Sequence, residues 1–210
     1  MSKLQDVENA VVSGKSKLVA GLVQEALDEG CSAPDILNGM INAMSIVGER
    51  FKKNEIFVPE MLVAARAMKK GVDVLKPHLA SGSAGVCGKA IIGTVAGDLH
   101  DIGKNLVAMM IESAGFEVID LGVDVPVEKF IETVKANPDV KIVGCSALLT
   151  TTMPALKSTV EALNAEDFRS HIKVMVGGAP ITQQFADEIG ADAYTPDAAS
   201  AAQKAKELVA

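Results

Sequence analysis

The stretch KAIIGTVAGDLHDIGKNLVAMM, residues 89–110, joins a short apolar run, a polar loop and the start of an amphipathic segment. An apolar run of this length that ends at a glycine is typical of a strand buried in a parallel sheet. The loop carries one histidine, His100, flanked by Asp98 and Asp101. The sequence therefore predicts a β-strand over 89–95 whose carboxyl end presents a histidine.

The rest of the C-terminal half repeats this alternation of apolar and amphipathic segments. Further strands are expected at 117–120, 140–145, 172–176 and 191–194, with helices between them and a last helix from about Ala198. Such alternation indicates a parallel sheet covered by helices on both faces. Five strands of this kind most often take the order 2-1-3-4-5. We expect an α/β domain with a flavodoxin-like (Rossmann-like) five-stranded parallel sheet.

The N-terminal half is predicted to be helical. Apolar residues recur at helical spacing in three segments, and a short helix before Ser13 would make a fourth. Ser32 followed by Pro34 resembles a helix start, and Pro59 opens the last pattern. A four-helix bundle is the economical packing for such helices.

The boundary between these halves falls in HLASGSAGVCG, where small residues are typical of a flexible connection. The sequence predicts a helical domain over 1–78, a linker over 79–88 and the α/β domain over 89–210.

Composition and charge argue against several partners. The net charge of −7 disfavours a phosphate backbone, and a chain with no Trp and one Tyr offers few rings for base stacking. No apolar run approaches the ~18 residues of a membrane-spanning helix. The N-terminus lacks a signal-peptide pattern, and the three cysteines lie far apart, which suits a reducing compartment. We expect a cytoplasmic protein without nucleic-acid or membrane partners.

A ligand of the predicted sheet would bind at the switch point between strands 1 and 3, beyond their carboxyl ends. The loops at this point are GDLHDIG, residues 97–103, and SALLTTT, residues 146–152. The loop after strand 4 adds Gly177 and Gly178, which allow close approach of a bulky group. The topology makes these loops neighbours, so the sequence predicts one ligand site there.

Each feature also has an ordinary structural explanation. A lone loop histidine is most often solvated, and Asp101 would cap a helix that starts near Ile102. A phosphate-binding loop fits poorly because the chain has neither GxGxxG nor GxxxxGKS/T after strand 1. A zinc site would need more ligands than His100 and a carboxylate. One histidine beside a glycine-lined cleft suggests a metal that brings most of its own ligands, as a macrocycle does.

The same residues carry a family resemblance. DLHDIG matches the DxHxxG signature of cobalamin-binding domains, and its SxL and GG parts appear as Ser146-Ala147-Leu148 and Gly177-Gly178. VGERF and FVPEMLVAARAMKKGVDVLKP resemble the helical cap domain of the methionine synthase cobalamin module. Over nearly its whole length the chain resembles the corrinoid methyl-carrier proteins of methylamine, methanol and betaine methyltransferase systems.

This resemblance implies cobalamin, as methylcobalamin or a related corrinoid, whose nucleotide tail detaches from cobalt and threads into the α/β domain. His100 would become the lower axial cobalt ligand, the base-off/His-on form. Asp98 would hold the other ring nitrogen, and Thr152 would continue the relay at a position where a serine is usual. The catalytic residues implied are therefore His100, Asp98 and Thr152, with His100 as the metal ligand.

The resemblance also implies a wider set of cofactor contacts. In the α/β domain these are Gly97, Asp98, Leu99, His100, Asp101, Gly103, Ser146, Leu148, Thr150, Gly177, Gly178 and Ala198. Of these, Ser146 and Thr150 match positions that touch the nucleotide tail. In the helical domain Phe51, Val58, Met61 and Leu62 would cover the methyl face, the alternative being that they are ordinary bundle core.

The implied function is methyl transfer in one-carbon metabolism by a carrier that is not catalytic alone. A substrate:corrinoid methyltransferase would methylate the cobalt, and a corrinoid:acceptor methyltransferase would pass the methyl group to a thiol or tetrahydrofolate. A reductive activase is a further partner to consider. The alternative is a cobalamin-binding sensor or regulatory module, which the acidic charge and the absence of residues for a DNA-binding domain disfavour. The sequence leaves the methyl donor open.

Overall fold

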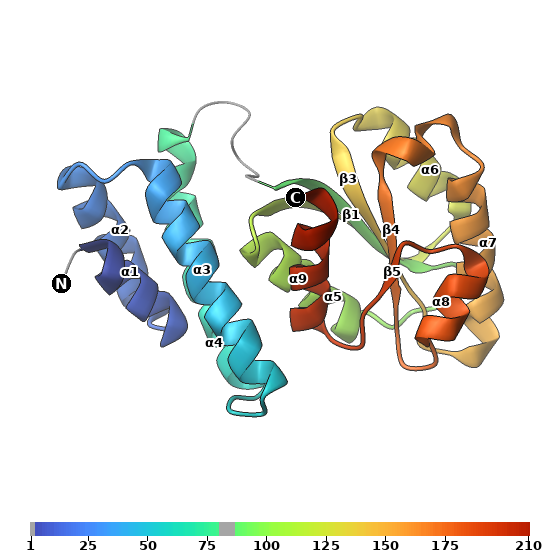
Figure 1. Ribbon diagram of the computed structural model, residues 1–210, viewed down its shortest axis with the longest axis horizontal. Helices are drawn as coiled ribbons and strands as arrows, with labels where there is room; N and C mark the ends of the chain where they lie inside the picture. The colour runs from blue at the N-terminus through green and yellow to red at the C-terminus, as the bar shows by residue number, and fades with distance from the viewer. Residues whose placement is uncertain (1–2, 80–86) are drawn as a thin grey trace. The chain divides into compact units, whose positions relative to one another are not determined.

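The computed structural model describes residues 3–79 and 87–210 and separates into two compact units. One unit holds the N-terminal helices and the other holds the sheet (Figure 1). The predicted linker, 79–88, falls mostly outside the described residues, and the domain limits at 78 and 89 stay predictions. Within the described ranges, no helix combines the length and apolar character needed to cross a lipid bilayer.

Within residues 3–79, four α-helices form the N-terminal unit, as predicted. They are α1 (Lys3–Val12), α2 (Ser16–Asp28), α3 (Ala33–Lys52) and α4 (Val58–Leu75), followed by the short 3-10 helix η1 (Lys76–His78). Helices α1 and α4 each pack against both α2 and α3, which closes the bundle.

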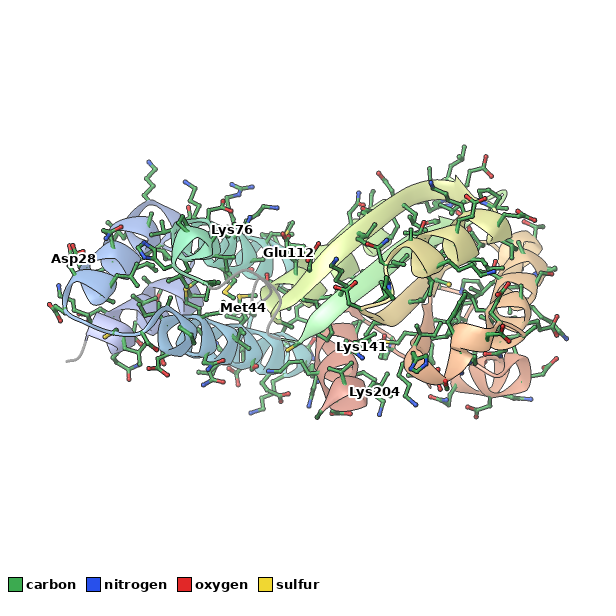
Figure 2. All side chains as sticks on the ribbon, turned by 90° about the horizontal axis from the view of Figure 1, so that it is seen from above. Asp28, Met44, Lys76, Glu112, Lys141 and Lys204 are labelled. Atoms are coloured by element: carbon green, nitrogen blue, oxygen red, sulfur yellow. The ribbon has the colours of Figure 1, made fainter. Side chains whose placement is uncertain are left out.

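The starts and faces of these helices follow from the sequence. Ser32 caps α3, because its Oγ accepts a hydrogen bond of 3.2 Å from the backbone N–H of Asp35. The apolar stripe of α3 lies in the bundle interior, where Met44 is buried, whereas Asp28 at the end of α2 reaches into solvent (Figure 2). Burial of such stripes supplies most of the stability of a helical bundle.

The second unit is built on one parallel sheet. Its strands are β1 (Gly88–Val95), β2 (Phe116–Val125), β3 (Val140–Ser146), β4 (Lys173–Gly177) and β5 (Ala193–Tyr194). They lie in the order β2-β1-β3-β4-β5, so the predicted topology is confirmed. Strand β2 is longer than expected. It continues through Gly122 by register shifts against β1, with φ values of 85° at Gly122 and 52° at Asp124.

Helices cover both faces of the sheet (Figure 1). Helices α5 (Ile102–Ser113) and α9 (Ala198–Val209) lie on one face, and α6 (Val127–Ala136), α7 (Met153–Asn164) and α8 (Gln183–Ile189) lie on the other. Two 3-10 turns, η2 (Thr150–Thr152) and η3 (Asp167–His171), flank α7. The core between the sheet and α6 and α7 is apolar and centres on the fully buried Phe130. The chain leaves β1 and β3 toward opposite faces of the sheet. The carboxyl ends of these two strands therefore mark the topological switch point, where ligands of such sheets bind.

Candidate functional site

Asp98 is the meeting point of the loops after β1 and β3. Its carboxylate is fully buried. One oxygen, Oδ1, accepts the backbone N–H of His100 at 3.1 Å and lies 2.7 Å from His100 Nδ1. The other, Oδ2, accepts the Leu148 N–H and the Thr152 hydroxyl, each at 2.7 Å. Three residues singled out in the sequence, His100, Asp98 and Thr152, therefore form one hydrogen-bonded chain.

These contacts fix the charge of Asp98. Burial alone would raise the pKa of its carboxyl group, but the hydrogen bonds from Leu148, Thr152 and His100 outweigh burial and hold that pKa well below its usual range. The carboxylate is therefore ionised at neutral pH and has no hydrogen to donate. His100 must carry its hydrogen on Nδ1, which leaves the lone pair of the neutral ring on Nε2. With 48% of the His100 side chain exposed, Nε2 is available to a ligand from outside.

Thr152 is the last member of this hydrogen-bonded chain, and its hydroxyl group has two possible acceptors. Its Oγ1 lies 2.7 Å from Asp98 Oδ2 and 2.9 Å from the carbonyl oxygen of Leu149. A hydroxyl has a single hydrogen, so Thr152 donates to one of these oxygens at a time. The charge on Asp98 can thus gain or lose one donor without any movement of the backbone.

Asp124 anchors the His100 loop from β2. Its Oδ1 accepts the N–H of Gly97 at 2.7 Å, and its own N–H donates to the carbonyl oxygen of Asp98 at 2.9 Å. Gly97 has a φ of 80° and Asp124 one of 52°, both in the left-handed region. Asp124 was not among the residues predicted from the sequence. The only signal was an aspartate in LGVDVP, directly after the predicted second strand.

Thr94 joins the same loop to β3 and was also missed. Its Oγ1 lies 2.9 Å from the carbonyl oxygen of His100 and 2.9 Å from Ser146 Oγ. Thr94 is buried, and it supplies the one hydroxyl group in the apolar run KAIIGTVA. That isolated hydroxyl in a buried strand was the signal that could have found it.

Gly178 is required by the backbone of the chain itself. A Cβ atom at this position, where φ is 133°, would lie 1.8 Å from the carbonyl oxygen of Ala147. The loops after β3 and β4 are in direct contact there, and the Ala147 N–H donates to the carbonyl oxygen of Gly177 at 3.2 Å. A Cβ at Gly177 would meet only ordinary contact, 3.4 Å from the carbonyl oxygen of Thr195.

Apolar side chains are exposed in the two loops that carry His100 and Ser146. Leu99 is 72% and Ile102 is 85% exposed, and Leu148 and Leu149 are each about two-fifths exposed. Apolar groups left in water at one end of a sheet are typical of a surface that a ligand covers. A metal macrocycle fits this arrangement, because it needs one nitrogen from the protein and an apolar bed. Among residues 3–79 and 87–210, no cluster of three or more His, Cys, Asp or Glu side chains could hold a bare metal ion.

The other predicted contacts of the α/β domain lie at the same end or next to it. Helix α5 begins at Ile102, as expected, and the Asp101 carboxylate accepts from the Asn105 side-chain amide at 3.2 Å. Gly103 faces open space, and Thr150 is exposed in η2. Ala198 is the buried first residue of α9.

The four predicted cap residues belong to the helical unit. Met61 is buried, Phe51 and Leu62 are half-buried, and Val58 is 39% exposed. Burial of Met61 agrees with an ordinary core position. A role for these side chains over a cofactor stays a prediction.

Comparison with known proteins assigns the class. A B12 binding domain model matches residues 88–204, and a second B12 binding domain model matches residues 4–76. The chain belongs to the corrinoid proteins built from these two domains, and its cofactor is cobalamin or a related corrinoid. The family, the fold class and the cofactor predicted from the sequence are thus confirmed.

Particular relatives match over nearly the full chain. The chain is 46% identical over 209 residues to the dimethylamine corrinoid protein of Methanosarcina barkeri, covering 99% of this chain and 97% of the relative. A crystal structure of a cobalamin-binding protein from Desulfitobacterium hafniense superposes with a TM-score of 0.83 at 33% identity, covering 99% and 98% of the two chains. A chain of the methanol:cobalamin methyltransferase complex from Methanosarcina barkeri superposes with a TM-score of 0.84 at 27% identity, covering 99% of this chain and 79% of that one.

Proposed function

We propose that the protein carries a methyl group on the cobalt of a corrinoid bound base-off, with His100 Nε2 as the lower axial ligand. The observation that supports this most directly is the bond of 2.7 Å between His100 Nδ1 and the buried Asp98 carboxylate. It holds the ring hydrogen on Nδ1 and leaves a lone pair on Nε2 of a half-exposed ring, where it could bind a metal.

Bound corrinoid supplies a cobalt centre that accepts a methyl group when reduced and gives it up to a nucleophile. The chain's own contribution is to tune one ligand. Asp98 keeps the ring hydrogen on Nδ1, so that the lone pair of Nε2 would be free to bind cobalt. Thr152 can stabilise the negative charge of Asp98 by donating its hydrogen to Oδ2, or it can donate to the carbonyl oxygen of Leu149 instead.

The relatives support a methyltransferase as the partner. One is described as a dimethylamine corrinoid protein, and another is part of a methanol:cobalamin methyltransferase complex. We infer a substrate:corrinoid methyltransferase as the first partner and a methylated amine as the class of methyl donor. The acceptor methyltransferase, its thiol or tetrahydrofolate substrate and a reductive activase are proposed from the sequence alone.

Electron spin resonance of the cobalt(II) form tests the ligand. The protein is prepared once with ordinary and once with nitrogen-isotope-labelled histidine and reconstituted with unlabelled cobalamin. If a protein histidine binds cobalt, the isotope changes the nitrogen splitting of the spectrum. An unchanged splitting would mean that the benzimidazole of the tail is the ligand, and it would refute the His-on proposal. His171→Gln serves as the control and keeps the histidine pattern.

A methyl-transfer assay tests the carrier role separately. The reduced protein is mixed with dimethylamine and with a candidate methyltransferase that uses this amine, and cobalt methylation is followed by absorbance. Methylation that needs both the partner and His100 is expected. Methylation that proceeds equally with free cobalamin would argue against a dedicated carrier.

A further inference from the structure

Thr94 lies between the backbone of His100 and Ser146. It is 1% exposed near the end of β1 and pairs in register with Ser146 of β3. Its Oγ1 is 2.9 Å from the carbonyl oxygen of His100 and 2.9 Å from Ser146 Oγ. One buried hydroxyl therefore contacts both the residue proposed to bind cobalt and the serine proposed to touch the nucleotide tail.

The direction of these two bonds follows from the number of hydrogens. A carbonyl oxygen can only accept, so the bond to His100 uses the single hydrogen of Thr94. The bond between the two hydroxyl groups must then be donated by Ser146. In this arrangement Ser146 Oγ offers only lone pairs to a ligand, because its hydrogen is already used.

Hydroxyl groups in such a chain influence one another. The bond donated by Ser146 polarises the Thr94 hydroxyl and strengthens the bond that Thr94 donates to His100. A ligand atom that accepts a hydrogen bond from Ser146 removes the bond that Ser146 donates to Thr94. The bond that Thr94 donates to the carbonyl oxygen of His100 is then weaker. A ligand atom that donates to Ser146 has the opposite effect.

We propose that Thr94 is a positioning residue that couples occupation of the tail slot to the placement of His100 beneath the cobalt. This inference rests on the proposed function, since it needs His100 as the cobalt ligand and Ser146 as a tail contact. Thr94 touches neither the metal nor the corrin in this scheme and acts through the backbone carbonyl of His100.

The experiment compares the wild type, Thr94→Val and Thr94→Ser, each bound to cobalamin or to cobinamide, which has no nucleotide tail. The measured quantity is the fraction of cobalt(II) that shows histidine nitrogen splitting. Thr159→Val is the matched control. Thr159 is equally buried and also donates one hydrogen bond to a carbonyl oxygen, that of Ala155 within α7.

Thr94→Val is expected to lower the ratio of histidine-bound to histidine-free cobalt by roughly five-fold, the equilibrium equivalent of one hydrogen bond. Thr94→Ser should restore it, and Thr159→Val should leave it unchanged while losing similar thermal stability. In the wild type the ratio should differ between cobalamin and cobinamide, and in Thr94→Val this difference should disappear.

The possible failures are distinguishable. A wild type without histidine splitting overturns the proposed function and this inference with it. Histidine splitting in the wild type that Thr94→Val leaves unchanged overturns the inference alone. A tail dependence that persists in Thr94→Val also overturns it, because the coupling then runs through another residue.

Discussion

Two polar clusters lie at the start of α5, and they differ in whether their hydrogen-bonding groups are all used. The Lys104 side chain is 2% exposed, and its Nζ donates to both Asp120 oxygens, at 2.7 and 2.6 Å, and to Asn105 Oδ1 at 2.6 Å. An ammonium group has three hydrogens, so this cluster is closed. The Asp98–His100 cluster is saturated around the carboxylate, yet its imidazole ring keeps a lone pair at the surface.

This difference separates a structural role from a functional one. The closed cluster ties the first turn of α5 to β2, and all three hydrogens of its buried ammonium group are used. The open cluster uses a buried, charged acceptor to prepare a nitrogen for a metal. The contrast predicts opposite consequences of mutation. Changes in the closed cluster should cost the most stability and spare the ligand, whereas changes in the open cluster should cost less stability and impair the ligand.

The largest effect on stability is expected from Asp120→Ala. It leaves the Lys104 ammonium buried without its charged partner, which should lower the free energy of unfolding by about 3–5 kcal/mol. Urea denaturation of the apo-protein measures this. Asp139→Ala is the matched control, because Asp139 is exposed and pairs with Lys89 at 3.1 Å, and it should cost less than about 1 kcal/mol. Equal losses in the two variants would contradict a special role for the buried pair.

Asp98→Asn should have an intermediate effect on stability. The amide replaces one of two acceptor oxygens, and each oxygen accepts from two donors. The Thr152 hydroxyl or the His100 ring can adjust, but one backbone N–H loses its acceptor, at a cost of about 1–3 kcal/mol. The amide N–H₂ can also donate to His100 Nδ1, which moves the ring hydrogen to Nε2. We expect a reduced fraction of histidine-bound cobalt(II) in the spin-resonance spectrum. A fraction equal to that of the wild type would show that the charge on Asp98 does not set the tautomer.

His100→Ala should change the stability of the apo-protein by less than about 1 kcal/mol, because its half-exposed ring contributes little to the core. The histidine splitting should vanish completely and cobalamin retention should weaken, both by more than in Asp98→Asn. Thermal unfolding of the apo-protein and equilibrium dialysis with cobalamin measure the two effects. Loss of the cooperative unfolding transition would mean that His100 is structural.

The smallest effect is expected at Cys145, whose buried thiol lies next to Ser146 in β3. Burial raises the pKa of its thiol to about 12. The pKa of this thiol is higher in the folded than in the unfolded protein. The contribution of the protonated thiol to folding stability is therefore complete below pH 9 and is lost only as the pH rises from there toward 12. At pH 8.5 iodoacetamide should modify the partly exposed Cys31 while Cys145 stays unmodified until the protein is unfolded. Peptide mass analysis checks this, and rapid labelling of native Cys145 would show that the core under β3 opens.

Much of the fold was predictable from the sequence, because short local patterns of apolar residues specify most of its strands and helices. The apolar runs marked all five strands, and the helical spacing marked the bundle. The misjudged elements were β2 and β5. The pattern after Asp120 looks broken by Gly122 and Asp124, whereas the strand continues by register shifts against β1. The expected strand at 191–194 shortens to Ala193–Tyr194, as the side chain of Asp192 accepts from the Val174 N–H at 2.6 Å.

The sequence by itself determined the class of site. Asp98 and His100 are two residues apart, and their side chains meet whenever the loop turns at Gly97. Tertiary structure alone decided which distant groups complete that pair, because these contacts cross between strands. Thr152 is 54 residues from Asp98, and Ser146 is 52 residues from Thr94. Strand register places Thr94 opposite Ser146, and a slip of one residue would turn the Thr94 hydroxyl to the other face of the sheet.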